Sequence, residues 1–394
     1  MRQGPPGHGT FAAGRTRRVK ALDGARSPPR AALPPPPTRP AATRPEHGRT
    51  TNYARKGHRG VLRFVVRRLL QLIPTLLGLS VLLFIWLNRL PGGPASAILG
   101  EKATEAEVAR INRALGLDQP VYVQYGRFIK RLIEGDLGTS TQTGQPVMDE
   151  FLLRFPATVE LSLMAIVLAV AVGVPLGYFA AKRRGGWLDV AAVSSSLIGI
   201  CIPVFFLAFM LRTVFSVNLG WFPSYGRLTT GINATEVTGL AVLDGLLTGE
   251  FDATWDALSH LILPAIALAS IPVAVIVRMT RASVLEVLGE DYVRTAESKG
   301  LRKGVVRTRH VLRNALLPVI TSVGLLTGSL LSGAVLTESV FTFGGIGSFI
   351  RTAIDGRDYP VLVGFIMFIA MAYVLINLLV DLAYSLIDPR VRVH

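Results

Sequence analysis

Six long apolar stretches constrain the fold of this chain more than any other feature of its sequence. Each approaches or exceeds the roughly 20 apolar residues that a helix needs to cross a hydrocarbon core of about 30 Å. Half of the residues are hydrophobic, which is too high a share for a soluble chain of this length. The sequence therefore predicts an all-α, polytopic membrane protein. Its six transmembrane helices are expected at about 69–88, 157–180, 190–215, 258–278, 317–338 and 361–387.

The positive charge is unevenly distributed along the chain. Of the formal net charge of +16, residues 1–68 contribute +14, because they hold 16 Lys and Arg against two acids. Further cations gather at 182–184 and within 278–313, whereas the connection 218–256 has one Arg and five acids. Because Lys and Arg are enriched in cytoplasmic loops, both termini and the 278–313 connection are expected in the cytoplasm. This sorting by side indicates membrane topology, and no nucleic-acid partner is expected.

The connection 281–316 carries the most specific residue pattern. It contains Asp291-Tyr292-Val293-Arg294-Thr295-Ala296-Glu297-Ser298-Lys299-Gly300, followed by His310-Val311-Leu312-Arg313-Asn314-Ala315-Leu316-Leu317-Pro318. Residues 291–298 are predicted to form a short helix that Gly300 ends. Ala296 is small where another surface must approach closely. An ordinary basic loop would explain the charge but not this ordered string of residue types.

The pattern resembles the coupling loop of ABC-importer permeases, in the variety found in the dipeptide/oligopeptide/nickel family. Blocks in the outside segments also resemble that family, so the match runs from about Val61 to Val393. Two departures from the general motif, Arg294-Thr295-Ala296 in place of Glu-Ala-Ala and a longer spacing from Gly300 to Pro318, are usual for the peptide/nickel branch. The resemblance implies the type I ABC importer permease fold. It also implies ATPase contacts at Asp291, Tyr292, Arg294, Thr295, Ala296, Gly300 and Leu301.

The same resemblance implies a bacterial inner-membrane complex in which this chain is the first of two permease subunits. Its expected partners are a second, related permease, two ATPase subunits, an extracytoplasmic solute-binding protein and membrane lipid. Peptides are the expected substrate, while nickel chelates, opines and glutathione remain open. The chain is not expected to be an enzyme or to bind a cofactor or metal, because it has no GxxxxGK[ST] phosphate loop, scattered histidines and a single cysteine, Cys201. ATP would be bound by the partner subunits.

Four segments are expected along the chain. Residues 1–60 form a basic Pro/Arg-rich tail, 61–90 the first transmembrane helix, 91–156 an extracytoplasmic segment, and 157–394 the core permease domain with five transmembrane helices. The tail has too few large apolar residues to offset its ordering entropy and is predicted to be disordered. It is a solvated tail, a basic arm that touches anionic lipid, or the product of a start assigned upstream of Val61.

Small residues recur every four positions on two of the expected helices, so that they lie on one helical face. Such stripes let helices approach closely in lipid, either within the subunit or along a pore or partner surface. They comprise Gly173 and Gly177, and Gly324, Gly328 and Ser332.

Ionisable residues within the expected spans are few, and each needs a partner or a route to water. Glu160, Arg212 and Arg89 fall near outer ends, from which their side chains can reach the interface. Asp381 is the deepest, and a structural pair or partner contact is favoured there over a substrate site. The absence of a carboxylate array disfavours a proton-driven transporter. A stand-alone secondary transporter or channel, and a membrane scaffold, are the alternatives from other classes.

Overall fold

The computed structural model describes residues 53–89, 104–115, 119–232 and 234–387. Within these ranges the chain is helical and has no strand, apart from an isolated bridge between Thr139 and Pro146. The side chains of 53–69, 111–112, 114–115, 331–332 and 381–387 are not described, so the calls on Ser332, Asp381 and most of the tail lie outside the described residues. The helices are α1 (Tyr53–Arg89), α3 (Glu105–Leu115), α4 (Val121–Ile133), α5 (Val147–Lys182), α6 (Trp187–Cys201), α7 (Val204–Leu211), α8 (Ala241–Thr248), α9 (Phe251–Leu288), α10 (Asp291–Ser298), α11 (Lys303–Val305), α12 (Arg313–Phe341), α13 (Ile346–Asp355) and α14 (Tyr359–Ile387), with π-helical turns η1 (Arg212–Asn218) and η2 (Val306–Leu312).

Five of the six predicted spans lie within single long helices, namely α1, α5, α9, α12 and α14. These helices are long and apolar enough to cross a membrane, and two bent helix pairs also meet that test. Several extend well beyond the predicted spans. At 38 residues, α9 is about 57 Å long, which exceeds the hydrocarbon thickness by nearly half of its length.

The span predicted at 190–215 is not one continuous helix. The structure divides it into α6 and α7, which meet at an angle of 101°. The break falls at Ile202 and Pro203, where Ile202 is extended with φ −80° and ψ 122°. Proline disfavours the helical conformation in the residue before it and has no N–H to donate, so the helix ends there. Because α6 and α7 are both apolar, the hydropathy of residues 190–215 does not reveal the break between them.

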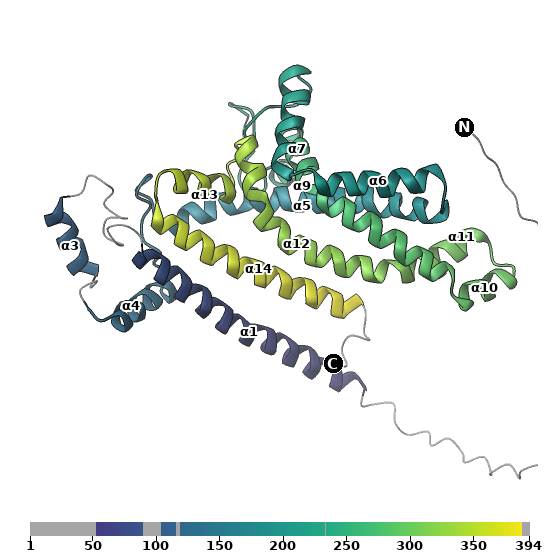
Figure 1. Ribbon diagram of the computed structural model, residues 1–394, viewed down its shortest axis with the longest axis horizontal. Coiled ribbons are helices and arrows are strands. Elements are labelled where there is room, and N and C mark those ends of the chain that lie inside the picture. Colours follow the sequence, from purple (N-terminus) through teal and green to yellow (C-terminus); the bar gives the residue numbers. More distant parts are fainter. Residues whose placement is uncertain (1–52, 90–103, 116–118, 233, 388–394) are drawn as a thin grey trace, which may run out of the picture. The chain divides into compact units, whose positions relative to one another are not determined.

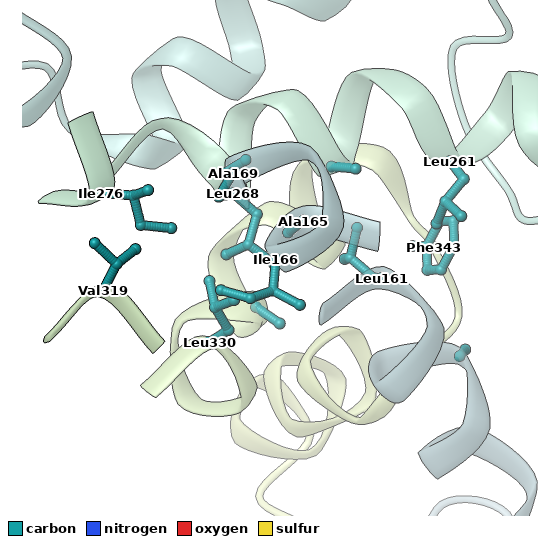
Figure 2. Packing of buried hydrophobic residues seen from close by; sticks show 14 residues of the cluster. Leu161, Ala165, Ile166, Ala169, Leu261, Leu268, Ile276, Val319, Leu330 and Phe343 are labelled. Atoms are coloured by element: carbon teal, nitrogen blue, oxygen red, sulfur yellow. The ribbon is translucent and has the colours of Figure 1, made fainter. Parts of the chain in front are cut away.

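The main core forms where α5, α9 and α12 pack together (Figure 1). Figure 2 shows Leu161 and Ile166 of α5 converging with Leu268 of α9 and Leu330 of α12. Small residues on α5 make this packing possible. A Cβ at Gly173 would lie 2.7 Å from Cγ2 of Ile276 on α9, and a Cβ at Gly177 would lie 2.6 Å from the backbone oxygen of Val277.

The second small-residue stripe faces α14, which runs beside α12 in Figure 1. A Cβ at Gly324 would overlap the side chain of Val380, and one at Gly328 would lie 2.7 Å from Oδ1 of Asn377. Both glycine pairs therefore serve close packing between helices of this chain.

A buried carboxylate holds the bend between α12 and α13, which is 81°. Glu338 is fully buried and accepts hydrogen bonds from Oγ1 of Thr158 on α5 at 2.6 Å and from the backbone N–H of Gly347 at 2.7 Å. Thr158 Oγ1 in turn accepts the backbone N–H of Ile346 at 2.9 Å. A buried carboxylate is tolerated only when it is hydrogen-bonded, so this network fixes where α13 begins.

Candidate functional site

The residues predicted to contact an ATPase lie on and just after α10. The helix begins after Glu290, whose backbone is extended, and covers Asp291–Ser298 as the sequence predicts. Gly300 has φ +74°, a left-handed conformation that glycine adopts without strain. The backbone N–H of Gly300 donates to the carbonyl of Glu297 at 2.9 Å and that of Leu301 to Ala296 at 3.4 Å. These bonds close the last turn, so Gly300 ends the helix.

One face of α10 is packed against the rest of the chain. Val293 and Ala296 are 2% and 6% exposed, and they join an apolar cluster with residues from the ends of the long helices. The cluster also contains Ala181 of α5, Val284 of α9, Val306 and Val311 of η2, and Ala315 of α12. The buried face of α10 is therefore packed against three long helices.

The opposite face of α10 is exposed, and six of the seven predicted contact residues lie on it or just after it. They are Asp291, Tyr292, Arg294, Thr295, Gly300 and Leu301. Ala296 differs from the other six, because the surface that approaches it closely belongs to its own chain. Val293, which the sequence reasoning did not single out, has the more buried side chain. Its signal was the spacing of Val293 and Ala296, three residues apart on one helical face.

A side-chain network ties α10 to the start of α12. Nδ2 of Asn314 donates to the hydroxyl oxygen of Tyr292 at 2.9 Å and to the carbonyl of His310 at 3.0 Å. The Tyr292 hydroxyl donates to the same carbonyl at 3.4 Å. His310 lies in η2, where the helix is widened into a π-helical turn. Such turns are frequent at functional sites, and this one lies between α10 and α12.

Positive charge predominates in the connection that follows α10. Residues 290–313 hold seven Lys and Arg against three acids, and those cations are exposed. The one ion pair between α10 side chains that the described residues show is Arg294 with Asp291, at 3.9 Å and with both groups exposed. Exposed pairs contribute little to stability. The surface therefore retains its positive potential for a partner with acidic groups.

Two family models cover most of the chain. The model for "Binding-protein-dependent transport system inner membrane component" matches residues 173–393, which is more than half of the sequence. The chain belongs to this family. The model for the N-terminal part of such membrane components matches residues 61–162. The chain is therefore a multi-pass inner-membrane permease of a binding-protein-dependent transport system.

The alignments of this permease with its curated relatives extend over nearly the full length of each relative. It is 47% identical to the dipeptide transport system permease protein DppB of Alkalihalophilus pseudofirmus, over 84% of this chain and 100% of that protein. It is 44% identical to the dipeptide transport system permease protein DppB of Escherichia coli K12, over 84% and 99%. The glutathione transport system permease protein GsiC of Salmonella paratyphi A is 38% identical, again over 84% and 99%.

A partly buried ion pair joins α9 to α6. Arg281 of α9 donates from Nε and Nη2 to the two carboxylate oxygens of Asp189 on α6, at 2.5 and 2.9 Å. Asp189 also accepts the backbone N–H of Gly185 at 2.9 Å. A bidentate Arg–carboxylate pair fixes orientation as well as distance. The pair joins the end of α9, from which α10 emerges, to α6 and to the turn that follows α5.

Two ionisable residues that were expected to reach the interface by themselves have partners in the permease. Glu160 on α5 accepts Nε of Arg227 at 3.0 Å and the backbone N–H of Val242 at 2.7 Å. Arg212 donates to the carbonyl of Val340 at 2.8 Å. The partners lie 67 to 128 residues away in sequence, so only the fold reveals them. Glu160 thus joins α5 to the connection 219–240 and to α8, and Arg212 joins η1 to α12.

Proposed function

We propose that this permease is the first of two related permease subunits in an ATP-driven importer of di- and oligopeptides, and that α10 is its ATPase-coupling helix. Family membership supports the transport role, and relatives named as dipeptide permeases support the substrate. The observation that carries the coupling role is the two-sided construction of α10, with one face exposed and the other buried against α5, α9 and α12, in a connection rich in exposed cations.

The proposed complex contains a second permease, two ATPase subunits and an extracytoplasmic solute-binding protein, all embedded in or bound at a lipid membrane. Both termini and α10 lie in the cytoplasm, in accordance with the cations of the α10 connection and the acids of the connection 218–256. ATP is bound and hydrolysed by the partner subunits. The binding protein delivers the peptide to the opposite side.

In this mechanism, closure of the ATPases on nucleotide displaces α10. The movement passes through Val293 and Ala296 to the helix ends and through the Tyr292–Asn314 contact to α12. Because these contacts are close-packed, a displacement is transmitted rather than absorbed. The interface of the two permeases then alternates between an outward-open and an inward-open path.

The test blocks the exposed face without disturbing the buried one. Thr295 is exposed on α10, and Thr352 is exposed on α13 at a distant part of the permease. The complex carrying Thr295→Trp should lose copurified ATPase and ATP-dependent uptake of a radiolabelled dipeptide into proteoliposomes. The matched control Thr352→Trp should keep both. Normal uptake by the Thr295→Trp complex would contradict the coupling role of α10.

Glutathione is the second candidate substrate, because a permease named for glutathione transport is 38% identical over nearly its full length. Glutathione is itself a tripeptide with a γ-linked glutamate. Uptake of radiolabelled glutathione and of a radiolabelled dipeptide, each measured in the same proteoliposomes, separates the two candidates. ATP-dependent uptake of glutathione without uptake of the dipeptide would assign the permease to glutathione.

A further inference from the structure

A cavity of about 360 Å³ lies among α1, α4, the start of α5 and α14, away from α10. Its walls are apolar and include Ile73 and Leu77 of α1, Ile129 and Leu132 of α4, and Met367 of α14. Ser80 is the one hydroxyl residue among those that line the cavity, and its Oγ is already bonded to the Leu77 carbonyl at 2.8 Å and to the Tyr125 hydroxyl at 2.9 Å. A water molecule needs two or more polar partners, so this cavity favours an apolar occupant.

We propose that the cavity binds one acyl chain of a membrane phospholipid whose phosphate lies at α4. The side chains of Ile73 and Leu77, which line the cavity, are exposed on a helix that is long and apolar enough to cross the membrane. An exposed apolar surface on a membrane-spanning helix is in contact with the acyl chains of lipids. An enclosed apolar cavity of about 150 Å³ admits benzene, and this one has more than twice that volume.

The charge on α4 selects a lipid rather than another apolar ligand. Ile129 and Leu132 line the cavity, while Lys130 and Arg131 in the same turn are exposed. The ion pair between Lys130 Nζ and Glu134, at 3.7 Å, joins two exposed side chains and contributes little to stability. A helix with an apolar face in the membrane and cations on its polar face lies in the headgroup region, where cations attract anionic lipid. An acyl chain and its phosphate thus find complementary groups one helical turn apart.

The residue types in the cavity argue against a helix of the second permease as the occupant. Helices that dock in lipid present Gly, Ala, Ser or Thr to each other. The lining here includes Met148, Met367 and Met371, which are flexible and adapt to irregular partners. Such a surface suits a chain that changes conformation, as an acyl chain does.

The test uses the whole permease in its complex, reconstituted in nanodiscs with phosphatidylglycerol that carries a diazirine in one acyl chain. After illumination, labelled peptides are mapped by mass spectrometry. We expect label concentrated at the cavity residues of α1, α4 and α14, above that at Leu82, which is more exposed on α1 but does not line the cavity. Leu77→Trp, which fills the cavity, should lower this label about tenfold, since two lost methylene contacts suffice for that factor. Leu82→Trp, the matched control on the same helix, should leave it unchanged.

Two results would overturn the proposal. Label spread over α1 in proportion to exposure, and equal in the Leu77→Trp complex, would show ordinary annular lipid only. Cavity residues that cross-link to the second permease and take no lipid label would show a subunit interface. If Leu77→Trp does not insert, Ile129→Trp fills the same cavity from α4. Exchange of phosphatidylglycerol for phosphatidylcholine should weaken the label, and the double variant Lys130→Gln with Arg131→Gln should remove that difference.

Discussion

Truncation of Val293 to alanine separates the docking of the ATPase from the transmission of its movement. Val293 is 2% exposed and belongs to the cluster that joins α10 to the long helices. Losing two methyl groups removes about 1.6 kcal/mol of burial, and the cavity left behind brings the cost to about 2 kcal/mol. That is about a 30-fold change in the ratio of packed to detached α10. The exposed face is unaltered, and alanine favours helix more than valine does.

The assay measures dipeptides imported per ATP hydrolysed in proteoliposomes, together with the ATPase that copurifies. The Val293→Ala complex should retain the ATPase and lose much of its transport per ATP. Val305→Ala is the matched control, because Val305 is 40% exposed and outside the cluster, and its effect should stay within about 0.5 kcal/mol. Equal coupling ratios in the two variants, or complete loss of ATPase binding in Val293→Ala, would refute transmission through this cluster.

Three further predictions concern packing, the α10 network and pH. Gly177→Val should destabilise the permease by about 1–3 kcal/mol or more, seen as a lower melting temperature in detergent, while Gly78→Val, where a Cβ has no neighbour within 4 Å, should not. Tyr292→Phe and Asn314→Ala should each cost about 0.5–1 kcal/mol, and a double-mutant cycle on melting temperature should show less than additive loss; full additivity would mean that the 2.9 Å contact contributes nothing. Burial raises the pKa of Asp244, but the hydrogen bonds it accepts outweigh burial and hold its pKa below the ordinary value. Its stabilisation is therefore complete above the unfolded-state pKa of about 4 and lost as pH falls through the lower folded value, so Asp244→Asn should flatten the acid limb of the stability curve, and an unchanged acid limb would contradict the assignment.

Hydrophobic length predicted the spans because a membrane requires it of any crossing helix, whatever the fold around it. The short helix at 291–298 and its end at Gly300 were also predictable, since helix ends depend on local residues. The bend of 101° at Pro203 could not be predicted from local residues, because α6 and α7 also contact α9, and α7 contacts α12. The pairing of Asp189 with Arg281 spans 92 residues, and a single sequence contains nothing that joins them.

The inward face of α10 was missed for a related reason. Ala296 was interpreted from its size alone, and small size is required equally by a neighbouring subunit and by the chain's own helices. Only the burial of Val293 beside it shows which surface is close. Whether a partner also reaches Ala296 remains a prediction of the family resemblance.

The length of α9 has a mechanical consequence for the permease. The helix accepts contacts from the connection 219–240 near its beginning, where Asp256 takes the backbone N–H of Thr229 at 2.7 Å, and α10 follows directly after its end. A rod of about 57 Å that tilts by about 5° moves its far end by roughly 5 Å, close to one helical turn. In the proposed complex, a displacement of the start of α9 by the binding protein is thus transmitted to α10 along one continuous helix.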